Sequence, residues 1–144
     1  MNVRDRIKEE LGKKISYWQE VNSKRIYFTI DKKDIFKTTE FMFGKLGLRF
    51  AIASGLETVT GFEILYHFSY DKTGEIYSLR VLIEGKQSPE IDSITPIFPA
   101  AEWIEREIWE LLGINFKGHP NLKRLLLSED WPEGEYPLRH KNEP

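Results

Sequence analysis

The spacing of hydrophobic residues changes several times along the chain, and each change predicts a new element. Residues 3–11 carry a hydrophobic side chain at every fourth position and precede Gly12, which is typical of a short amphipathic helix that ends at a glycine. Residues 15–21 and 25–30 are rich in β-branched and aromatic side chains. They are joined by Asn22-Ser23-Lys24, so they predict a β-hairpin.

A second helix is predicted after Asp31, which is a good N-cap residue. Hydrophobic and small residues then recur at helical spacing and form one stripe, which comprises Ile35, Thr39, Met42 and Leu46. Gly47 is expected to end this helix, because glycine is favoured just past a helix C-terminus.

Strand spacing dominates the middle of the chain. In residues 48–54, Leu48, Phe50 and Ile52 alternate toward one face. The clearest alternation spans residues 61–70 and 75–84, and the turn between them predicts an antiparallel hairpin. A last strand is expected within 90–98, at a sheet edge because Pro96 interrupts it.

A third helix is predicted with Pro99 in its first turn and Gly113 at its end. Its hydrophobic stripe comprises Ala101, Ile104, Ile108 and Leu111. The order of elements predicts an α+β fold, with a mixed or antiparallel sheet and about three helices packed on it. We expect a core domain over residues 1–112 and an extended C-terminal arm over residues 113–144.

The C-terminal arm has little periodicity, although residues 121–127 can form one turn of helix. It still carries hydrophobic residues that a disordered tail would lack, namely Leu125, Leu126, Leu127, Trp131, Tyr136 and Leu138. An irregular segment of this length is unusual inside a compact domain. We therefore expect the arm to become ordered against another protein subunit.

Composition narrows the possible partners and cofactors. Lys and Arg number 21 against 23 for Asp and Glu, so no basic surplus favours nucleic acid or an anionic membrane surface. The absence of cysteine excludes a disulfide, a Cys-ligated iron–sulfur cluster, a thiolate zinc site and a cysteine nucleophile. The charged first residues are unlike a secretory signal, and no hydrophobic run approaches the ~18 residues of a membrane helix. We expect a soluble, intracellular chain.

Charged residues are concentrated on the third helix. Glu102, Arg106 and Glu110 share one face, where exposed ion pairs are worth only ~0.3–0.5 kcal/mol each. Glu105 and Glu107 point roughly 160° apart around the axis, so they cannot act together as an acid/base pair. A solvated charge ladder is favoured over catalysis. A charged face that meets a partner, with Arg106 in bidentate contacts, explains the pattern better than either.

His119 is held between Gly118 and Pro120, where it could serve as a proton relay or a ligand. The other histidines, His67 and His140, complete no metal-binding spacing with it. His67 lies on the minority face of its strand and is expected to pack or hydrogen-bond there. Phosphate-binding glycine motifs and a serine nucleophile motif are also missing, so we expect no metal and no cofactor in this chain.

Trp103 and Trp109 fall outside the hydrophobic stripe of the third helix, which predicts apolar surface on more than one side. Aromatic residues beside an arginine are typical of protein interfaces. The residues alone therefore predict a cofactor-free binding or scaffold protein whose C-terminal third is its interface. The alternatives are a small hydrolase that uses Glu105 or His119, and a free-standing soluble adaptor.

A long and specific set of residues marks the C-terminal third. It comprises Glu105-Arg106-Glu107, Glu110, Gly113-Ile114, Phe116, Gly118-His119-Pro120, Leu122, Arg124, Asp130-Trp131 and Pro137-Leu138-Arg139. This set resembles the signature of the C-subunit family of NADH–quinone oxidoreductase (respiratory complex I), and the resemblance covers nearly the whole chain. Glu110 stands where the family most often has Asp, and residues 52–69 are more similar to hydrogenase-type members.

The resemblance implies a cofactor-free structural subunit in the peripheral arm of a membrane enzyme, at the cytoplasmic face and attached to the membrane only through the complex. The implied enzyme is an NADH- or ferredoxin-linked quinone reductase or a membrane-bound NiFe hydrogenase, in which electron transfer is coupled to ion translocation. The implied partners are the large NiFe-hydrogenase-like subunit and the iron–sulfur subunit, and the iron–sulfur clusters, with a NiFe centre in a hydrogenase, belong to partner subunits. The residues expected to bind them are Glu102, Glu105, Arg106, Glu107, Gly118, His119, Pro120, Arg124, Trp131, Pro137, Leu138 and Arg139.

Overall fold

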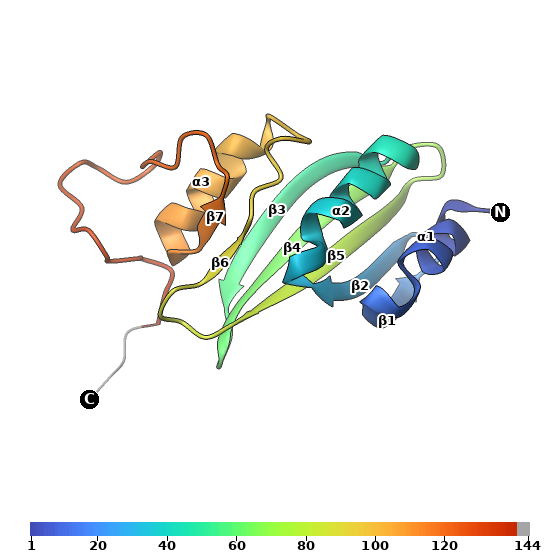
Figure 1. Ribbon diagram of the computed structural model, residues 1–144, viewed down its shortest axis with the longest axis horizontal. Helices are drawn as coiled ribbons and strands as arrows, with labels where there is room; N and C mark the ends of the chain where they lie inside the picture. Colours follow the sequence, from blue (N-terminus) through green and yellow to red (C-terminus); the bar gives the residue numbers. More distant parts are fainter. Residues whose placement is uncertain (141–144) are drawn as a thin grey trace.

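A five-stranded sheet forms the centre of the computed structural model, which describes residues 1–140 (Figure 1). The strands are β1 (Ile15–Asn22), β2 (Arg25–Asp31), β3 (Arg49–Glu57), β4 (Gly61–Tyr70) and β5 (Glu75–Glu84), arranged in the order β1-β2-β5-β4-β3. β2 and β5 are parallel, and the other neighbours are antiparallel. The predicted mixed sheet is therefore confirmed.

Three α-helices pack on this sheet, as predicted. They are α1 (Val3–Leu11), α2 (Ile35–Glu40) and α3 (Ala101–Leu112). Two short strands, β6 (Glu90–Asp92) and β7 (Asn115–Lys117), form a separate parallel pair. Figure 1 shows α1 and α2 in front of the sheet, with α3 beside β3.

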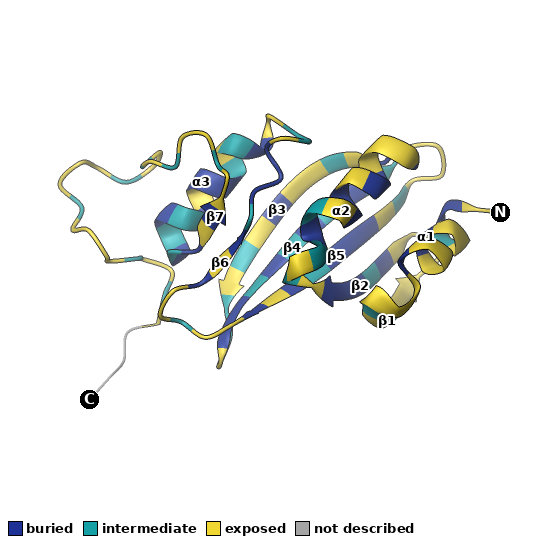
Figure 2. Cartoon of the chain, in the orientation of Figure 1, coloured by how far each residue is buried: buried dark blue, intermediate teal, exposed yellow. Residues whose placement is uncertain are grey.

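The hydrophobic core lies between the helices and one face of the sheet (Figure 2). The alternating residues of the central strands are buried there, namely Ile26, Phe28, Ile30, Phe62, Ile64, Tyr66, Phe68, Tyr77, Leu79, Val81 and Ile83. Burying each of these side chains stabilises the fold by about 1.5–3 kcal/mol. The period of two along these strands thus predicted the buried face correctly.

The first two helices follow their predicted boundaries. α1 ends at Gly12, which has a φ of 43°. The Asp31 side chain accepts a hydrogen bond from the backbone N–H of Lys33 (2.9 Å) and starts a 3₁₀ turn that leads into α2. α2 then widens into a π-helical turn, Phe41–Lys45, before Gly47. All four residues of the predicted stripe are buried.

Two strand predictions need correction. A register shift between Phe50 and Ile52 breaks the alternation of β3, so Ile52 is exposed and Ala53 is buried instead. A bulge adds one residue to a strand and thereby reverses the faces beyond it. In the predicted last strand, only Glu90–Asp92 is extended, and it pairs with β7 rather than with an edge of the main sheet.

The buried face of α3 is also rotated relative to the prediction. Leu112 is buried where Leu111 was expected, and Ile104 is only half-buried. This face packs on Gly55 of β3, where a Cβ atom would lie 2.9 Å from Leu112 and 3.2 Å from Ile108. The bare glycine therefore lets α3 approach the sheet closely. Pro99, expected in the first turn, precedes the N-cap of α3.

A substitution at Gly61 tests how closely β4 and β5 pack at this position. A Cβ atom at Gly61 would lie 1.9 Å from the backbone oxygen of Ile83, so Gly61→Ala should lower the free energy of unfolding by about 2–4 kcal/mol in chemical denaturation. Gly44→Ala is the control, because its Cβ atom would meet nothing within 4 Å. An equal and small effect of both substitutions would contradict this packing.

Candidate functional site

The C-terminal arm folds back on α3 (Figure 1). Residues 118–140 have no helix or strand, and the expected turn of helix over 121–127 is wrong. The arm nevertheless returns to the core: the Leu138 N–H donates to the Leu111 carbonyl (3.0 Å), and the His140 N–H donates to the Glu57 carboxylate on β3 (2.8 Å). The described part of the arm therefore has a defined path over its own domain.

Arg106 holds two consecutive backbone carbonyls of the arm. Its Nε donates to Lys123 (2.9 Å) and its Nη2 donates to Arg124 (2.7 Å). The side chain is only 5% exposed, and its guanidinium lies 5.0 Å from the ring centroid of Trp103. Arg106 thus uses the planar guanidinium to fix backbone groups that have no partner in a helix or sheet.

Glu110 binds the next three residues of the arm. Its carboxylate accepts hydrogen bonds from the N–H groups of Leu125 (3.1 Å), Leu126 (2.8 Å) and Leu127 (2.6 Å). Arg106 and Glu110 are four residues apart on one face of α3 and together fix five consecutive residues of the arm. Hydrogen bonds to charged groups are worth about twice those between neutral groups, so this short row of contacts is strong.

Glu105 connects α3 to the turn after β6. It is 1% exposed and accepts hydrogen bonds from the Ser93 hydroxyl (2.6 Å) and the Ile94 N–H (2.9 Å). Burial raises the pKa of Glu105 to about 7, although both hydrogen bonds lower it. Burial, and then the Glu105 charge, raise the pKa of Tyr66 well above its usual range.

His119 fastens the start of the irregular region. The N–H of Asn121 donates to Nδ1 (3.0 Å), which leaves Nε2 to donate to the Glu102 carbonyl (3.0 Å). Both ring nitrogens are therefore engaged within the chain.

His67 lies on β4 and forms a hydrogen bond with Ser78 through Nδ1 (2.7 Å), which confirms the hydrogen-bonding position predicted for it. Burial lowers the pKa of His67, and the positive charge of Arg25 lowers it further.

Arg139 closes the C-terminus of α3. It donates to the Leu112 carbonyl, where the helix dipole favours a cation, and its guanidinium lies between the rings of Phe62 (4.9 Å) and Tyr136 (4.8 Å). Gly113 makes this arrangement possible. It has a φ of 79°, and a Cβ atom there would lie 2.6 Å from Tyr136 and 2.7 Å from Arg139.

The interpretation of the helix charges as a solvated ladder is wrong, because Glu105, Arg106 and Glu110 are all buried. The amphipathic pattern gave no sign of this, since charged residues usually face water. Glu110 lay outside the predicted partner-binding set, although it is one turn beyond Arg106 and part of the signature. Glu102 is half-buried, and Glu107 is exposed.

The remaining predicted residues lie along the arm. Gly118 has a φ of 83° and turns the chain before Pro120, which is exposed. Arg124 donates through Nη1 to two further arm carbonyls, and the Trp131 Nε1 donates to the Glu135 carbonyl (2.8 Å).

The outer side of this region also exposes hydrophobic residues. Trp103 is 56% exposed, Leu126 62% and Leu138 54%, and Pro137 is exposed beside Leu138. Exposed apolar side chains on a segment whose backbone is fixed are typical of protein interfaces. The partner-binding role of these residues stays a prediction.

Two features of residues 1–140 bear on other functions. No group of three or more His, Asp or Glu side chains in that range could hold a metal ion. In the same range, every helix is too short or too polar to span a bilayer.

Three comparisons relate the chain to known proteins. Residues 28–143 match the family model described as "Respiratory-chain NADH dehydrogenase, 30 Kd subunit". The NADH-quinone oxidoreductase C-subunit of Salinispora tropica is 34% identical over 118 residues, which covers 72% of this chain and 46% of that protein. The C/D-subunit of Bacteroides thetaiotaomicron is 33% identical over 111 residues, covering 75% of this chain and 21% of that protein. The chain spans less than half the length of these relatives.

Two solved structures have a similar fold. A trypsin-resistant fragment of Nqo5 gives a TM-score of 0.69 at 21% identity, covering 85% of this chain and 100% of the fragment. A chain of the membrane-bound sulfane sulfur reductase, titled an archaeal respiratory membrane complex, gives a TM-score of 0.80 at 18% identity, covering 94% of this chain and 80% of that chain.

Glu110→Gln should loosen the arm without unfolding the core. The amide that replaces one carboxylate oxygen presents N–H donors to backbone N–H groups, so amide exchange at residues 125–127 should accelerate roughly 30-fold, or ~2 kcal/mol. Hydrogen exchange read by NMR or mass spectrometry measures this. Glu107→Gln is the matched control, since Glu107 is exposed on the same helix. Equal protection in both variants would show that the carboxylate does not hold the arm.

Glu105 should give the fold a specific pH dependence. Its pKa is about 7 in the fold and about 4.3 in an unfolded chain, so the folded state keeps the proton longer as pH rises. The stability contribution is complete below pH ~4.3, and about 3 kcal/mol of it is lost by pH ~7. Glu105→Gln stays neutral at every pH. Its free energy of unfolding, measured in urea titrations, should therefore rise relative to that of the native chain between pH ~4.3 and pH ~7. The control Glu107→Gln should show the same dependence of unfolding free energy on pH as the native chain. If Glu105→Gln also shows that dependence, Glu105 is not the group responsible.

Proposed function

The chain belongs to the family of the 30 kDa subunit of respiratory-chain NADH dehydrogenase, and on that basis we propose that it is a structural subunit of a complex I-related membrane oxidoreductase. It carries no redox cofactor and lies in the peripheral arm, at the cytoplasmic face. There it holds the large NiFe-hydrogenase-like subunit and the iron–sulfur subunit together. The clusters, and a NiFe centre in a hydrogenase, belong to those partners.

The observation that carries this proposal is the fixed backbone of the arm. Arg106, Glu110 and Arg139 bind backbone groups of the arm and of α3, so the arm has a defined shape before any partner is added. Trp103 is exposed on α3 and Leu126 is exposed on the fixed part of the arm, so the backbone that carries each of them is set before any partner binds. Preorganisation lowers the entropy cost of association, which suits a subunit that must dock in one orientation.

A structural role also fits the demands of electron transfer. Reactive centres work only when the surrounding shell holds them in a narrow range of positions. A subunit that binds the large subunit and the cluster-bearing subunit through a rigid surface contributes to turnover without carrying electrons. The donor side of the complex is NADH or ferredoxin, and its electron transfer is coupled to ion translocation.

The geometry favours this role over a small hydrolase. A hydrolase needs an acid or base free to meet a substrate. Glu105 is buried and bonded to Ser93 and Ile94, and His119 has both ring nitrogens engaged. These side chains serve the fold. Purification from the native cell distinguishes the other alternative, a free-standing adaptor, from a subunit of a complex.

The decisive measurement is affinity purification of the tagged chain from gently solubilised membranes of its own cell. We expect one large particle with iron in partner subunits, and nickel if the complex is a hydrogenase. Leu126→Glu changes an exposed residue and should reduce the co-purifying iron about tenfold, since a charge is placed in a desolvated contact. Arg106→Ala, which releases the arm carbonyls, should reduce it as well.

Val59→Glu is the control for this measurement, because Val59 is 94% exposed in the turn between β3 and β4. It should leave the particle unchanged. A lone protein of 17.0 kDa from the native chain would refute the proposal, and an intact particle from Leu126→Glu and Arg106→Ala would refute the role of the arm.

A further inference from the structure

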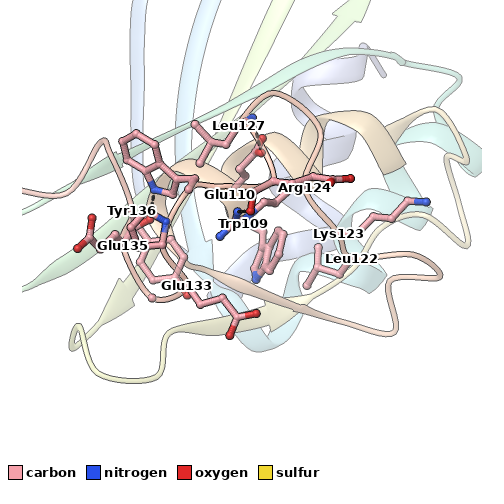
Figure 3. A pocket seen from close by; sticks show the side chains of 13 residues that line it. Trp109, Glu110, Leu122, Lys123, Arg124, Leu127, Glu133, Glu135 and Tyr136 are labelled. Atoms are coloured by element: carbon pink, nitrogen blue, oxygen red, sulfur yellow. Dashed lines mark hydrogen bonds between the residues drawn. The ribbon is translucent and has the colours of Figure 1, made fainter.

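A hollow of about 800 Å³ lies between α3 and the C-terminal arm (Figure 3). α3 contributes Trp109, and the arm contributes Trp131 and Tyr136, all of them half-buried. Figure 3 shows Trp109 facing the part of the arm that carries Glu133, Glu135 and Tyr136. The hollow therefore combines aromatic rings from two elements with exposed carboxylates from the arm.

The rings are held in place from within the chain. The Trp131 indole N–H donates to the Glu135 carbonyl (2.8 Å), which fixes the orientation of the ring. Tyr136 already has the Arg139 guanidinium 4.8 Å from its ring centroid. A rigid aromatic wall loses little conformational freedom when it binds a side chain, so it is a favourable contact surface.

The charge around the hollow is uneven. Residues 128–136 carry four acidic side chains and no basic one. Glu129, Glu133 and Glu135 are exposed at the hollow, and none of them takes part in an ion pair within residues 1–140. This side of the hollow is thus negative and available to a cation.

The other charged residues around the hollow differ in their availability. The Glu110 carboxylate is used by three backbone N–H groups, and Arg124 donates to the carbonyls of Ser128 and Glu129. Lys123 also lines the hollow, and Figure 3 places it on the side away from Glu133. The carboxylates without an ion pair therefore lie on the stretch of the arm that also carries Trp131 and Tyr136.

We infer that this hollow receives an arginine side chain from an extended segment of a partner subunit, an inference that rests on the proposed function. A guanidinium stacks on aromatic faces and bonds carboxylates with its edge, so it matches both walls at once. The same chain already uses this contact nearby, where Arg106 lies over Trp103 (5.0 Å). Lysine offers only a point charge and fits less well.

Site-directed cross-linking in the native complex tests this inference. Pro132 is exposed and lines the hollow, so benzoylphenylalanine in its place reports what enters. After irradiation of the purified particle, mass spectrometry should find a cross-linked peptide from another subunit with an arginine within a few residues of the attachment. The double substitution Glu133→Gln and Glu135→Gln should lower the cross-link yield about tenfold, because it removes two carboxylates that pair with the cation.

The matched control is Glu9→Gln with Glu10→Gln, which removes two exposed carboxylates from α1 and should leave the yield unchanged. A cross-linked partner peptide without an arginine, or a yield insensitive to the change at Glu133 and Glu135, overturns the inference. Iron in the same preparation separates the two proposals: if iron-bearing subunits co-purify while Pro132 cross-links only within its own chain, the hollow is not a docking site and the proposed function stands. A chain that purifies alone overturns both.

Discussion

The shape of the C-terminal third depends on where its backbone hydrogen bonds go. An irregular segment lacks the regular backbone hydrogen bonds of a helix or a sheet. Leaving a buried backbone N–H or C=O without a partner costs about as much free energy as losing a hydrogen bond. Arg106 and Glu110 meet this need with one donor and one acceptor side chain, a single helical turn apart. Neither charge would be tolerated in the interior without such partners, so the helix and the arm stabilise each other.

This arrangement also fixes one conformation among many. Removing one partner from a buried charge is strongly destabilising, whereas an apolar replacement of the whole set is often neutral for stability. Charges in this position therefore make more sense as a means of specifying the path of the arm than as a source of stability. A specified path is what a docking surface requires, because each mobile side chain or loop that must be ordered on binding weakens the association.

The sequence predicted the elements that follow a simple period and missed those decided by single contacts. β4, β5 and the stripe of α2 follow from alternation and helical spacing, because their buried faces are continuous. The buried face of α3 could not be derived in this way, since it packs against Gly55 of β3, a contact between segments far apart in the sequence. The buried roles of Glu105 and Arg106 could not be predicted either, because they bind backbone groups of distant segments. Almost every residue offers such groups, so the sequence does not show which of them a charged side chain will bind.

The parallel pairing of β2 with β5 has a consequence for synthesis of the chain. Paired residues such as Arg25 and Ile76 are about fifty positions apart in the sequence. At the usual speed of translation, β2 waits roughly 3–10 seconds on the ribosome before its neighbour is made. During that time β2 has an unpaired edge, and such an edge can pair with another chain, so the nascent chain is exposed to misassociation until β5 is made.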